Sequence, residues 1–300
     1  MANLKEVRTR INSVNSTMQI TSAMKMVSAS KLRKSQSTIV TLRPYASKLQ
    51  EIMQDLSSAM KTSAEGVYAK IHKENVEDEK ILLIPVASNK GLCGVFNVSV
   101  LRETLNALKE DYKVQFGKGN VDILCISKKI EETLIFRKYR VIGNENELLD
   151  KLSYENTLPF AEKLMSDFVE EKYDRIVFIY NQFKNAGSQF LKREQFLPIV
   201  TDNTNNDDDP RFAEFETEYI FQPSKDEIVN TLIPKSLKLQ VYKILLDSFA
   251  SEHGARMVSM TKATDNAAEL LKELNLSYNK ARQSAITNEI IEIVGGANAL

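Results

Sequence analysis

Both ends of the 300-residue chain show the apolar spacing of a coiled coil. Near the N-terminus, apolar side chains recur at intervals of three and four residues, which places them on one narrow stripe of a helix. The stripe has a first block, Leu4, Val7, Ile11, Val14 and Met18, and a second block, Tyr45, Leu49, Ile52, Leu56 and Ala59. We therefore expect one long N-terminal helix, which Pro44 bends or divides because proline lacks a backbone donor.

A second helical pattern begins after Pro234 and continues to Gly295 and Gly296. We expect the helix to end at these two residues, because glycine commonly ends a helix. Its stripe is rich in small residues: Ala250, Gly254, Met257, Thr261, Thr264, Ala268 and Leu271. At 1.5 Å per residue each terminal helix would be roughly 85 to 90 Å long, whereas a globular middle region should be about 35 to 40 Å across. We expect the two helices to pair in antiparallel fashion as a slender rod.

The stretch from Thr21 to Lys34, TSAMKMVSASKLRK, has few large apolar residues on its stripe. A coiled coil with so little apolar surface is weak by itself, since burial contributes roughly 25 cal/mol per Å². We therefore expect larger subunits to surround the rod. Four apolar side chains are expected to face outward toward such partners, namely Met24, Met26, Val27 and Leu32.

The middle of the chain alternates short β-branched runs with helical stretches. The runs ILLIPVAS, VDILCIS and DRIVFIYNQF read as strands, and residues 98–112, 128–137 and 145–169 read as helices. Such alternation predicts a parallel or mixed sheet covered by helices, and residues 185–188 predict the turn of a hairpin.

The predicted fold class is therefore α/β: a long antiparallel two-helix coiled coil formed by both termini plus a Rossmann-like α/β globular domain. The predicted division is 1–62 for the N-terminal coiled-coil helix, 63–222 for the globular domain with its connectors, and 223–300 for the C-terminal coiled-coil helix.

The segment ILLIPVASNKGLCGVFN has the order of strand, glycine turn and helix in which phosphate-binding loops occur. However, Gly91 and Gly94 match neither GxGxxG nor GxxxxGK(S/T), so we favour a turn-forming role over nucleotide binding. Cys93 would need a base to act as a nucleophile, and neither His72 nor His253 is placed to serve as one. We expect no catalytic residue in this chain.

Metal sites, cofactor sites and membrane spans also lack support in the sequence. The two cysteines, Cys93 and Cys125, form no CxxC pair, which argues against a zinc site or a disulfide framework. The acidic residues of TDNTNNDDDPRF do not follow the spacing of a calcium loop. No run reaches the roughly 18 apolar residues that a membrane span requires. We expect no metal, no cofactor and no direct span of the membrane.

The N-terminal helix is basic, although the whole chain balances 40 Lys and Arg against 40 Asp and Glu. Through Arg43, the only acidic residue is Glu6. Three interpretations remain open: a solvated face, a surface that binds an acidic protein, or a surface that follows nucleic-acid phosphates. No aromatic residue lies between Arg8 and Lys34, which weakens the third interpretation.

Three segments resemble the gamma subunits of bacterial F-type ATP synthases. They are ITSAMKMVSASKLRKSQ with RPYA after it, SNKGLCGVFN, and residues 251–299. The last segment contains the family signature I-T-x-E-x-x-E-x-x-x-G-A, here Ile286, Thr287, Glu289, Glu292, Gly296 and Ala297.

The resemblance implies a non-catalytic rotor subunit. In that family the coiled coil stands within a ring of three alpha and three beta subunits, and the globular domain meets the epsilon subunit and the ring of c subunits. Proton-driven rotation of the c-ring then drives ATP synthesis at the beta subunits, or ATP hydrolysis drives the reverse. The resemblance also implies a peripheral position on the cytoplasmic face of a bacterial inner membrane, with no nucleic-acid partner.

The same resemblance implies roles for individual residues. Contacts with the beta subunits are implied for Met24, Lys25, Arg33, Arg282, Gln283, Thr287 and Glu289. Lys25, together with the basic cluster at Lys31, Arg33 and Lys34, would complement an acidic lever loop of beta that Met24 faces. Arg282 and Gln283 would meet a catch loop. An apolar bearing inside a hydrophobic sleeve is implied for Ile290, Ile291, Ile293 and Val294.

Two other functions remain open from the residues. A stand-alone α/β nucleotide-binding enzyme with a coiled-coil appendage would bind ATP as the isolated chain. A basic coiled-coil nucleic-acid adaptor would bind DNA or RNA in a salt-sensitive manner.

Overall fold

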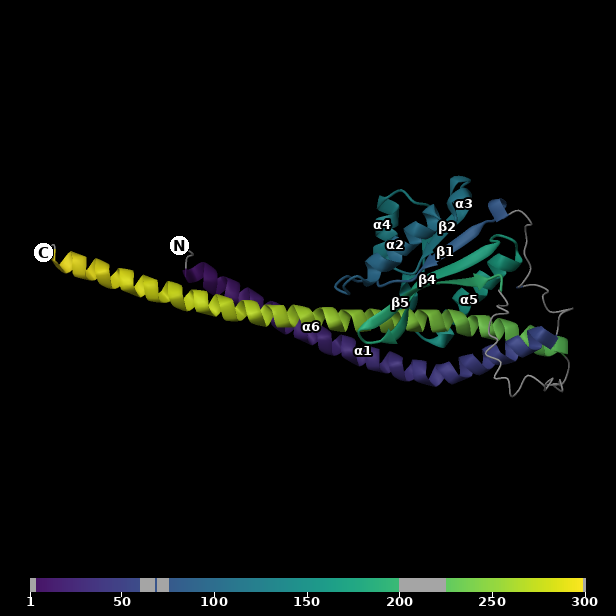
Figure 1. Ribbon diagram of the computed structural model, residues 1–300, viewed down its shortest axis with the longest axis horizontal. Helices are drawn as coiled ribbons and strands as arrows, with labels where there is room; N and C mark the ends of the chain where they lie inside the picture. The colour runs from purple at the N-terminus through teal and green to yellow at the C-terminus, as the bar shows by residue number, and fades with distance from the viewer. Residues whose placement is uncertain (1–3, 60–67, 69–75, 200–224, 299–300) are drawn as a thin grey trace, which may run out of the picture. The chain divides into compact units, whose positions relative to one another are not determined.

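The computed structural model describes residues 4–59, 68, 76–199 and 225–298 (Figure 1). The chain forms two compact units. The rod unit comprises residues 1–30 and 256–300, and the sheet unit comprises residues 31–255. The two long terminal helices, α1 (Leu4–Ala59) and α6 (Lys225–Asn298), each contribute to both units.

The sheet unit contains a five-stranded sheet in the order β3-β2-β1-β4-β5. Strands β1 (Ile81–Pro85), β2 (Val121–Cys125), β3 (Val141–Asn144) and β4 (Arg175–Asn185) are parallel, and β5 (Ser188–Leu197) is antiparallel to β4. The β4–β5 hairpin closes with Asn185 opposite Ser188, as the sequence predicts. Strand β3 was not predicted, because it is short, lies at the sheet edge and has no buried run.

Helices cover both faces of this sheet (Figure 1). They are α2 (Phe96–Lys109), α3 (Lys113–Gly117), α4 (Lys128–Phe136) and α5 (Tyr154–Val169), with short 3-10 turns at Val76–Asp78 and Asn146–Leu149. The helix predicted for residues 145–169 is wrong in its first turns. Helix α5 begins only at Tyr154, because the side chain of Ser153 caps it by accepting a hydrogen bond from the Asn156 N–H at 3.2 Å.

Alternate residues of the strands build two cores. On one face Leu82, Ile84 and Phe178 pack with residues of α5 and α6, such as Phe168 and Val241. On the other face, apolar residues of β1, β2 and β4 pack against α2 and α4. The strands contribute Ile81, Leu83, Ile123 and Val177, and the helices contribute Phe96, Val100 and Leu134. Every residue of β1 is buried, which explains why that strand reads as a continuous apolar run.

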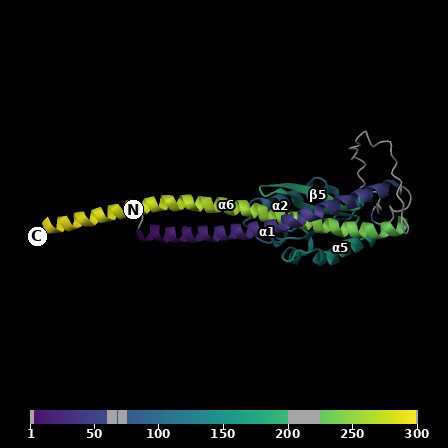
Figure 2. The same cartoon turned by 90° about the horizontal axis from the view of Figure 1, so that it is seen from below.

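In the rod unit, α1 and α6 lie side by side and run in opposite directions (Figure 1, Figure 2). Thr21 Oγ1 on α1 lies 2.9 Å from Thr264 Oγ1 on α6, so a hydrogen bond joins the turns that carry these two residues. Buried and half-buried residues of this unit recur at intervals of three and four, as predicted. Buried residues spaced by multiples of seven are Val7, Thr21 and Ser28 on α1, and Met260 and Ala267 on α6, of which the last two were not predicted. The predicted antiparallel coiled coil is therefore confirmed.

Several predicted positions on the helices are wrong. Ala268 is exposed, and its neighbour Ala267 takes the seam, because Ala267 lies three residues from Thr264 in the repeat. Leu32 is only 4% exposed instead of facing outward, since it continues the repeat from Thr21 and Ser28. Tyr45 is 47% exposed, whereas Leu49 is buried as expected.

The predicted helix ends are also corrected. Helix α6 is described from Lys225 and contains Pro234 within it, and α1 continues on both sides of Pro44. Gly295 and Gly296 lie inside α6, which continues to Asn298. Neither glycine adopts the left-handed conformation that ends a helix, and a Cβ atom added to either would point into open space.

Candidate functional site

The C-terminal part of α6 carries a cluster of exposed large aliphatic side chains. Seam residues of α6 are half-buried as far as Ala281, and every described residue from Arg282 to Ala297 is then exposed. Large aliphatic side chains on this segment are exposed by about half or more: Ile286 49%, Ile290 54%, Ile291 62%, Ile293 65% and Val294 53%. So much exposed aliphatic surface on a single helix is typical of an interaction surface.

The exposed aliphatic residues are arranged in a stripe. Ile286, Ile290, Ile293 and Val294 follow the i, i+4, i+7, i+8 spacing of one helix face, with Ile291 beside it. The predicted bearing residues therefore lie together. Ile286 belongs to the same stripe but was assigned only to the family signature, although its spacing from Ile290 could have placed it there.

The predicted polar contacts on α6 lie at the start of the exposed segment. Arg282, Gln283, Thr287 and Glu289 are all exposed. The Thr287 hydroxyl donates to the Gln283 carbonyl oxygen at 2.9 Å, so it stays close to the helix surface. The guanidinium of Arg282, the amide of Gln283 and the carboxylate of Glu289 leave donors and acceptors facing solvent on successive turns.

The predicted contacts on α1 fall in both units. In the rod unit, Met24 and Lys25 are half-buried at the edge of the seam, while Met26 and Val27 are 70% and 58% exposed. Arg33 belongs to the sheet unit and is exposed, as are Lys31 and Lys34. The basic cluster is therefore open to a partner, and the outward position predicted for Met26 and Val27 is confirmed.

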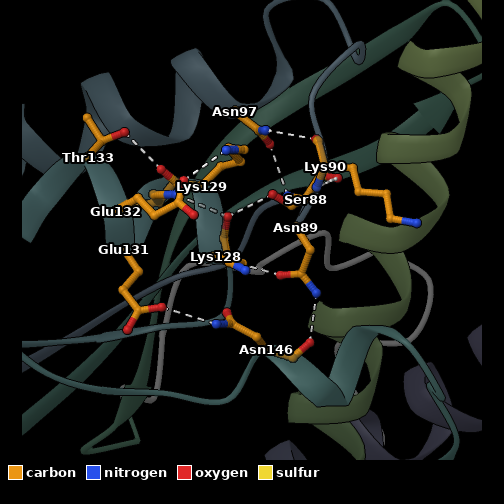
Figure 3. A network of polar contacts seen from close by, with 12 residues as sticks. Ser88, Asn89, Lys90, Asn97, Lys128, Lys129, Glu131, Glu132, Thr133 and Asn146 are labelled. Atoms are coloured by element: carbon orange, nitrogen blue, oxygen red, sulfur yellow. Dashed lines mark hydrogen bonds and ion pairs between the residues drawn. The ribbon is translucent and has the colours of Figure 1, made fainter.

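The glycine turn between β1 and α2 directs its polar groups into the sheet unit (Figure 3). The Ser88 N–H donates to Asn97 Oδ1 at 3.0 Å, and the Lys90 N–H donates to Ser88 Oγ at 3.1 Å. Leu92 and Gly94 adopt positive φ values of 62° and 61°, which allow the tight turn. This geometry supports a turn-forming role for the segment.

Hydrogen bonds also join this turn to the ends of β2 and β3. Asn89 donates from Nδ2 to the Asn146 carbonyl oxygen at 2.9 Å and accepts from the Lys128 N–H at 3.0 Å (Figure 3). The Ser127 hydroxyl donates to the Ser88 carbonyl oxygen at 2.8 Å. The three loops at the carboxyl edge of the parallel strands are thus tied to one another.

Helix α6 covers the crevice where a doubly wound sheet holds its ligand. That crevice lies at the carboxyl ends of the strands where the strand order reverses, here between β1 and β4. The Ser248 hydroxyl of α6 donates to the carbonyl oxygen of Val86, just after β1, at 3.4 Å. Nearby, α6 brings Gly254 against Ala186 in the turn after β4. The chain thus fills this place with its own helix.

The residues considered for chemistry are held inside the sheet unit. Cys93 and Cys125 are buried free thiols, and burial, assisted by the nearby Glu131 charge, raises the pKa of Cys125 to about 12. His253 is buried and stacks edge-on against Phe249, with ring centroids 4.4 Å apart. His72 lies outside the described residues, as does the acidic stretch 201–212.

The described residues offer neither a metal site nor a helix that could span a membrane. Over residues 4–59, 68, 76–199 and 225–298, no group of three or more His, Cys, Asp or Glu side chains could hold a metal ion. Within the same ranges, no helix combines the length and the apolar character that crossing a membrane requires.

Comparison with known proteins gives consistent matches over the whole chain. The ATP synthase family profile matches residues 3–300. The ATP synthase gamma chain of Christiangramia forsetii is 52% identical over 300 residues, covering 100% of this chain and 99% of that protein. The corresponding chain of Flavobacterium johnsoniae is 51% identical over 303 residues with the same coverage.

Solved structures share the fold at lower identity. A chain of the OSCP/F1/c-ring structure of the Euglena gracilis mitochondrial ATP synthase gives a TM-score of 0.63 at 20% identity, covering 99% of this chain and 94% of that chain. A chain of the central stalk and c-ring structure from Tetrahymena thermophila gives a TM-score of 0.58 at 24% identity, covering 81% of this chain and 99% of that chain.

Proposed function

Because this chain belongs to the family of ATP synthase gamma chains, we propose that it turns as the central stalk of the enzyme. In that role it couples proton-driven rotation of the c-ring to ATP synthesis at the beta subunits, or ATP hydrolysis to the reverse rotation. The observation that carries the proposal is the exposed aliphatic stripe on α6, which begins where the seam with α1 ends.

We assign the stripe at Ile290, Ile291, Ile293 and Val294 to a bearing inside an apolar sleeve of the alpha and beta subunits. Aliphatic contacts have no directional bonds, so the helix can turn in the sleeve while little is broken. Ile286 extends the stripe by one turn toward the rod. The exposed fractions of these side chains support a surface that only a surrounding partner can bury.

The polar surfaces fit partners of opposite character. The exposed Lys31, Arg33 and Lys34, with Lys25, would meet an acidic lever loop of beta, where charge complementarity guides the contact. Met24 would contact the same loop with an adaptable side chain. Arg282, Gln283, Thr287 and Glu289 would meet a catch loop through hydrogen bonds.

Coupling then follows from differential contact. A partner shifts a conformational equilibrium only by as much as it favours one state over another. A shaft whose faces differ, basic and methionine-containing on α1 but aliphatic on the end of α6, favours different states in three otherwise identical beta subunits. The chain itself contributes no bond-making residue in this proposal, and the nucleotide chemistry belongs to beta.

The remaining parts of the proposal concern partners and place. The globular region would meet the epsilon subunit and the c-ring, and the chain would be peripheral on the cytoplasmic face of a bacterial inner membrane. We propose that the chain divides by function into an N-terminal coiled-coil helix at 1–62, a globular domain with its connectors at 63–222, and a C-terminal coiled-coil helix at 223–300. The alternative of a nucleotide-binding enzyme loses support, because α6 occupies the ligand crevice of the sheet.

Co-purification from membranes tests this function. An affinity tag on a beta subunit should recover the full chain together with alpha, epsilon and the c-ring. A variant carrying Ile290→Ser, Ile293→Ser and Val294→Ser should lower this recovery, whereas Ile20→Ser, at a residue that is 61% exposed and has no assigned partner contact, should leave it unchanged. Recovery of a complete alpha and beta ring with a working c-ring in the absence of the chain would contradict the proposal.

A further inference from the structure

A hydrogen bond between two hydroxyl groups crosses the seam of the rod unit. Thr21 Oγ1 on α1 and Thr264 Oγ1 on α6 are 2.9 Å apart, and Thr21 is only 9% exposed. Each hydroxyl also lies near a carbonyl of its own helix, Thr21 at 3.0 Å from Met18 and Thr264 at 2.8 Å from Met260. Since a hydroxyl has one proton, one threonine donates across the seam while the other donates to its own helix.

The rest of this seam distinguishes poorly between alignments of the two helices. In the alignment set by the threonines, Val14 comes level with Leu271, because each lies one heptad from the pair. If one helix slides along the other by seven residues, seam positions again face seam positions, because the seam repeats every heptad. Val14 would then come level with Tyr278 or with Thr264, and Thr21 with Leu271 or Met257.

The Thr21–Thr264 pair is lost in both shifted alignments. In the slide that brings Val14 level with Thr264, Thr21 faces Met257 and no hydroxyl pair forms across the seam. In the opposite slide Ser28 takes the place of Thr21 opposite Thr264, and the Thr21 hydroxyl loses its partner because it faces Leu271. A polar pair at a seam position is the device by which coiled coils select one alignment among several. Smaller displacements matter as well, because a slide of one residue is about 1.5 Å and already breaks a bond of this length.

We propose that Thr21 and Thr264 are positioning residues that fix the axial alignment of the rod, and so set the partner-facing side chains of α1 relative to those of α6. Met24 follows Thr21 within one helical turn, and Arg282 follows Thr264 on α6. A heptad slide would displace one of these surfaces from the other by about 10 Å. This inference rests on the proposed rotor function, in which both surfaces must meet their partners together.

Cysteine crosslinking in the assembled enzyme reports the alignment directly. The pair V14C and L271C should form a disulfide in the native alignment, whereas V14C with Y278C and V7C with L271C report the two heptad slides. The native Cys93 and Cys125 are buried and stay in place. Each reporter pair is combined with Thr21→Val and Thr264→Val, which keep the shape of the side chain and remove the hydroxyl.

The matched control carries Thr21→Ser and Thr264→Ser, which retain both hydroxyls. We expect the serine variant to crosslink as the unsubstituted rod does. The valine variant should lose native crosslinking by about threefold or more, the effect of one lost hydrogen bond. It should also make less ATP per proton in reconstituted vesicles while still assembling. The single variant Thr21→Val serves the same purpose if the double variant does not assemble.

The outcomes separate the inference from the function on which it rests. If the unsubstituted chain does not assemble or does not couple, the proposed rotor function fails. If it couples and the valine variant retains both the native crosslinks and the native ATP yield, only the inference is overturned. A changed crosslinking pattern with unchanged ATP yield also overturns it, because the alignment would then not matter for coupling.

Discussion

Gly254 of α6 touches the backbone of Ala186 in the β4–β5 hairpin: a Cβ atom on Gly254 would lie 3.0 Å from the Ala186 carbonyl oxygen. Alanine normally stabilises a helix over glycine by up to about 1 kcal/mol. Here the added methyl group would push the hairpin away from α6, and overpacking of this kind costs about 1 to 3 kcal/mol. We expect Gly254→Ala to lower the free energy of unfolding of the full-length chain, measured by urea titration.

Gly295 is the matched control for this substitution. It also lies inside α6, but a Cβ atom added to Gly295 would point into open space and would crowd no neighbouring residue. Gly295→Ala should therefore leave the free energy of unfolding unchanged or raise it slightly. Equal stability of the Gly254→Ala and Gly295→Ala variants would show that the hairpin yields without cost.

Glu194 joins the sheet to α6 through a largely buried carboxylate. It accepts hydrogen bonds from the Tyr180 hydroxyl at 2.7 Å and from Gln240 Nε2 on α6 at 2.9 Å, and Lys192 Nζ lies 2.9 Å away. Burial raises the pKa of Glu194, but the hydrogen bonds from Lys192, Tyr180 and Gln240 outweigh it, so this pKa lies below its ordinary value of 4.5. The ionised form is therefore the one that stabilises the fold.

Glu194→Gln should lower the free energy of unfolding by about 1 to 2 kcal/mol at pH 7. A carboxyl group with a depressed pKa contributes its stability above the unfolded value and loses it as the pH falls through the folded value. The difference between the two proteins should therefore shrink below about pH 4.5. Thermal unfolding of the full-length chain across this range measures it, with Glu132→Gln at an exposed ion pair as control. A difference that does not depend on pH would contradict the assignment.

Cys125 should be inert toward thiol reagents in the folded protein. Its pKa of about 12, caused by burial and then by the Glu131 charge, leaves only about one molecule in ten thousand as thiolate at pH 8. Cys93 is buried as well, at 2% exposure. We expect both thiols to react with a chromogenic aromatic disulfide only after urea unfolds the protein and exposes them. Stoichiometric reaction within minutes in native buffer would show that the sheet opens readily.

The fold was largely predictable because its main signals are periodic. The runs that became β1, β2 and β4 are apolar and β-branched, and the block from Leu4 to Met18 keeps its interval without a break. Small residues carry no such signal. Ala267 and Ala268 have identical side chains, and only the phase set by Thr264 decides which one is buried.

The surface residues were harder to predict for a different reason. The outward position of Met26 follows from the helical repeat, but the same reasoning misplaced Leu32, because the seam continues through the small residues Thr21 and Ser28. The exposed stripe of α6 was found through family resemblance, although the spacing of Ile286, Ile290 and Ile293 would have indicated it. Which partner atoms these residues touch depends on other chains, and no pattern within one sequence encodes that.

Met24 is the position at which a single added charge should separate rotation from synthesis. Its side chain is half-buried at the edge of the rod seam, and the proposed partner there is an acidic loop of beta. Met24→Lys would add an ion pair to that contact in some rotary states and so oppose release of the loop. An added pair of up to about 1 kcal/mol should lower the ATP yield per proton by roughly two- to fivefold. ATP hydrolysis by the same complex should fall less.

Met26→Lys provides the control, because it adds the same charge to a side chain that is 70% exposed two positions along the helix. Reconstituted vesicles with a fixed proton gradient measure the ATP yield of both variants. High salt should partly restore Met24→Lys, since screening weakens an ion pair at a wet interface. An ATP yield per proton equal to that of the unsubstituted enzyme, or an equal loss in Met26→Lys, would exclude a specific contact between Met24 and an acidic loop.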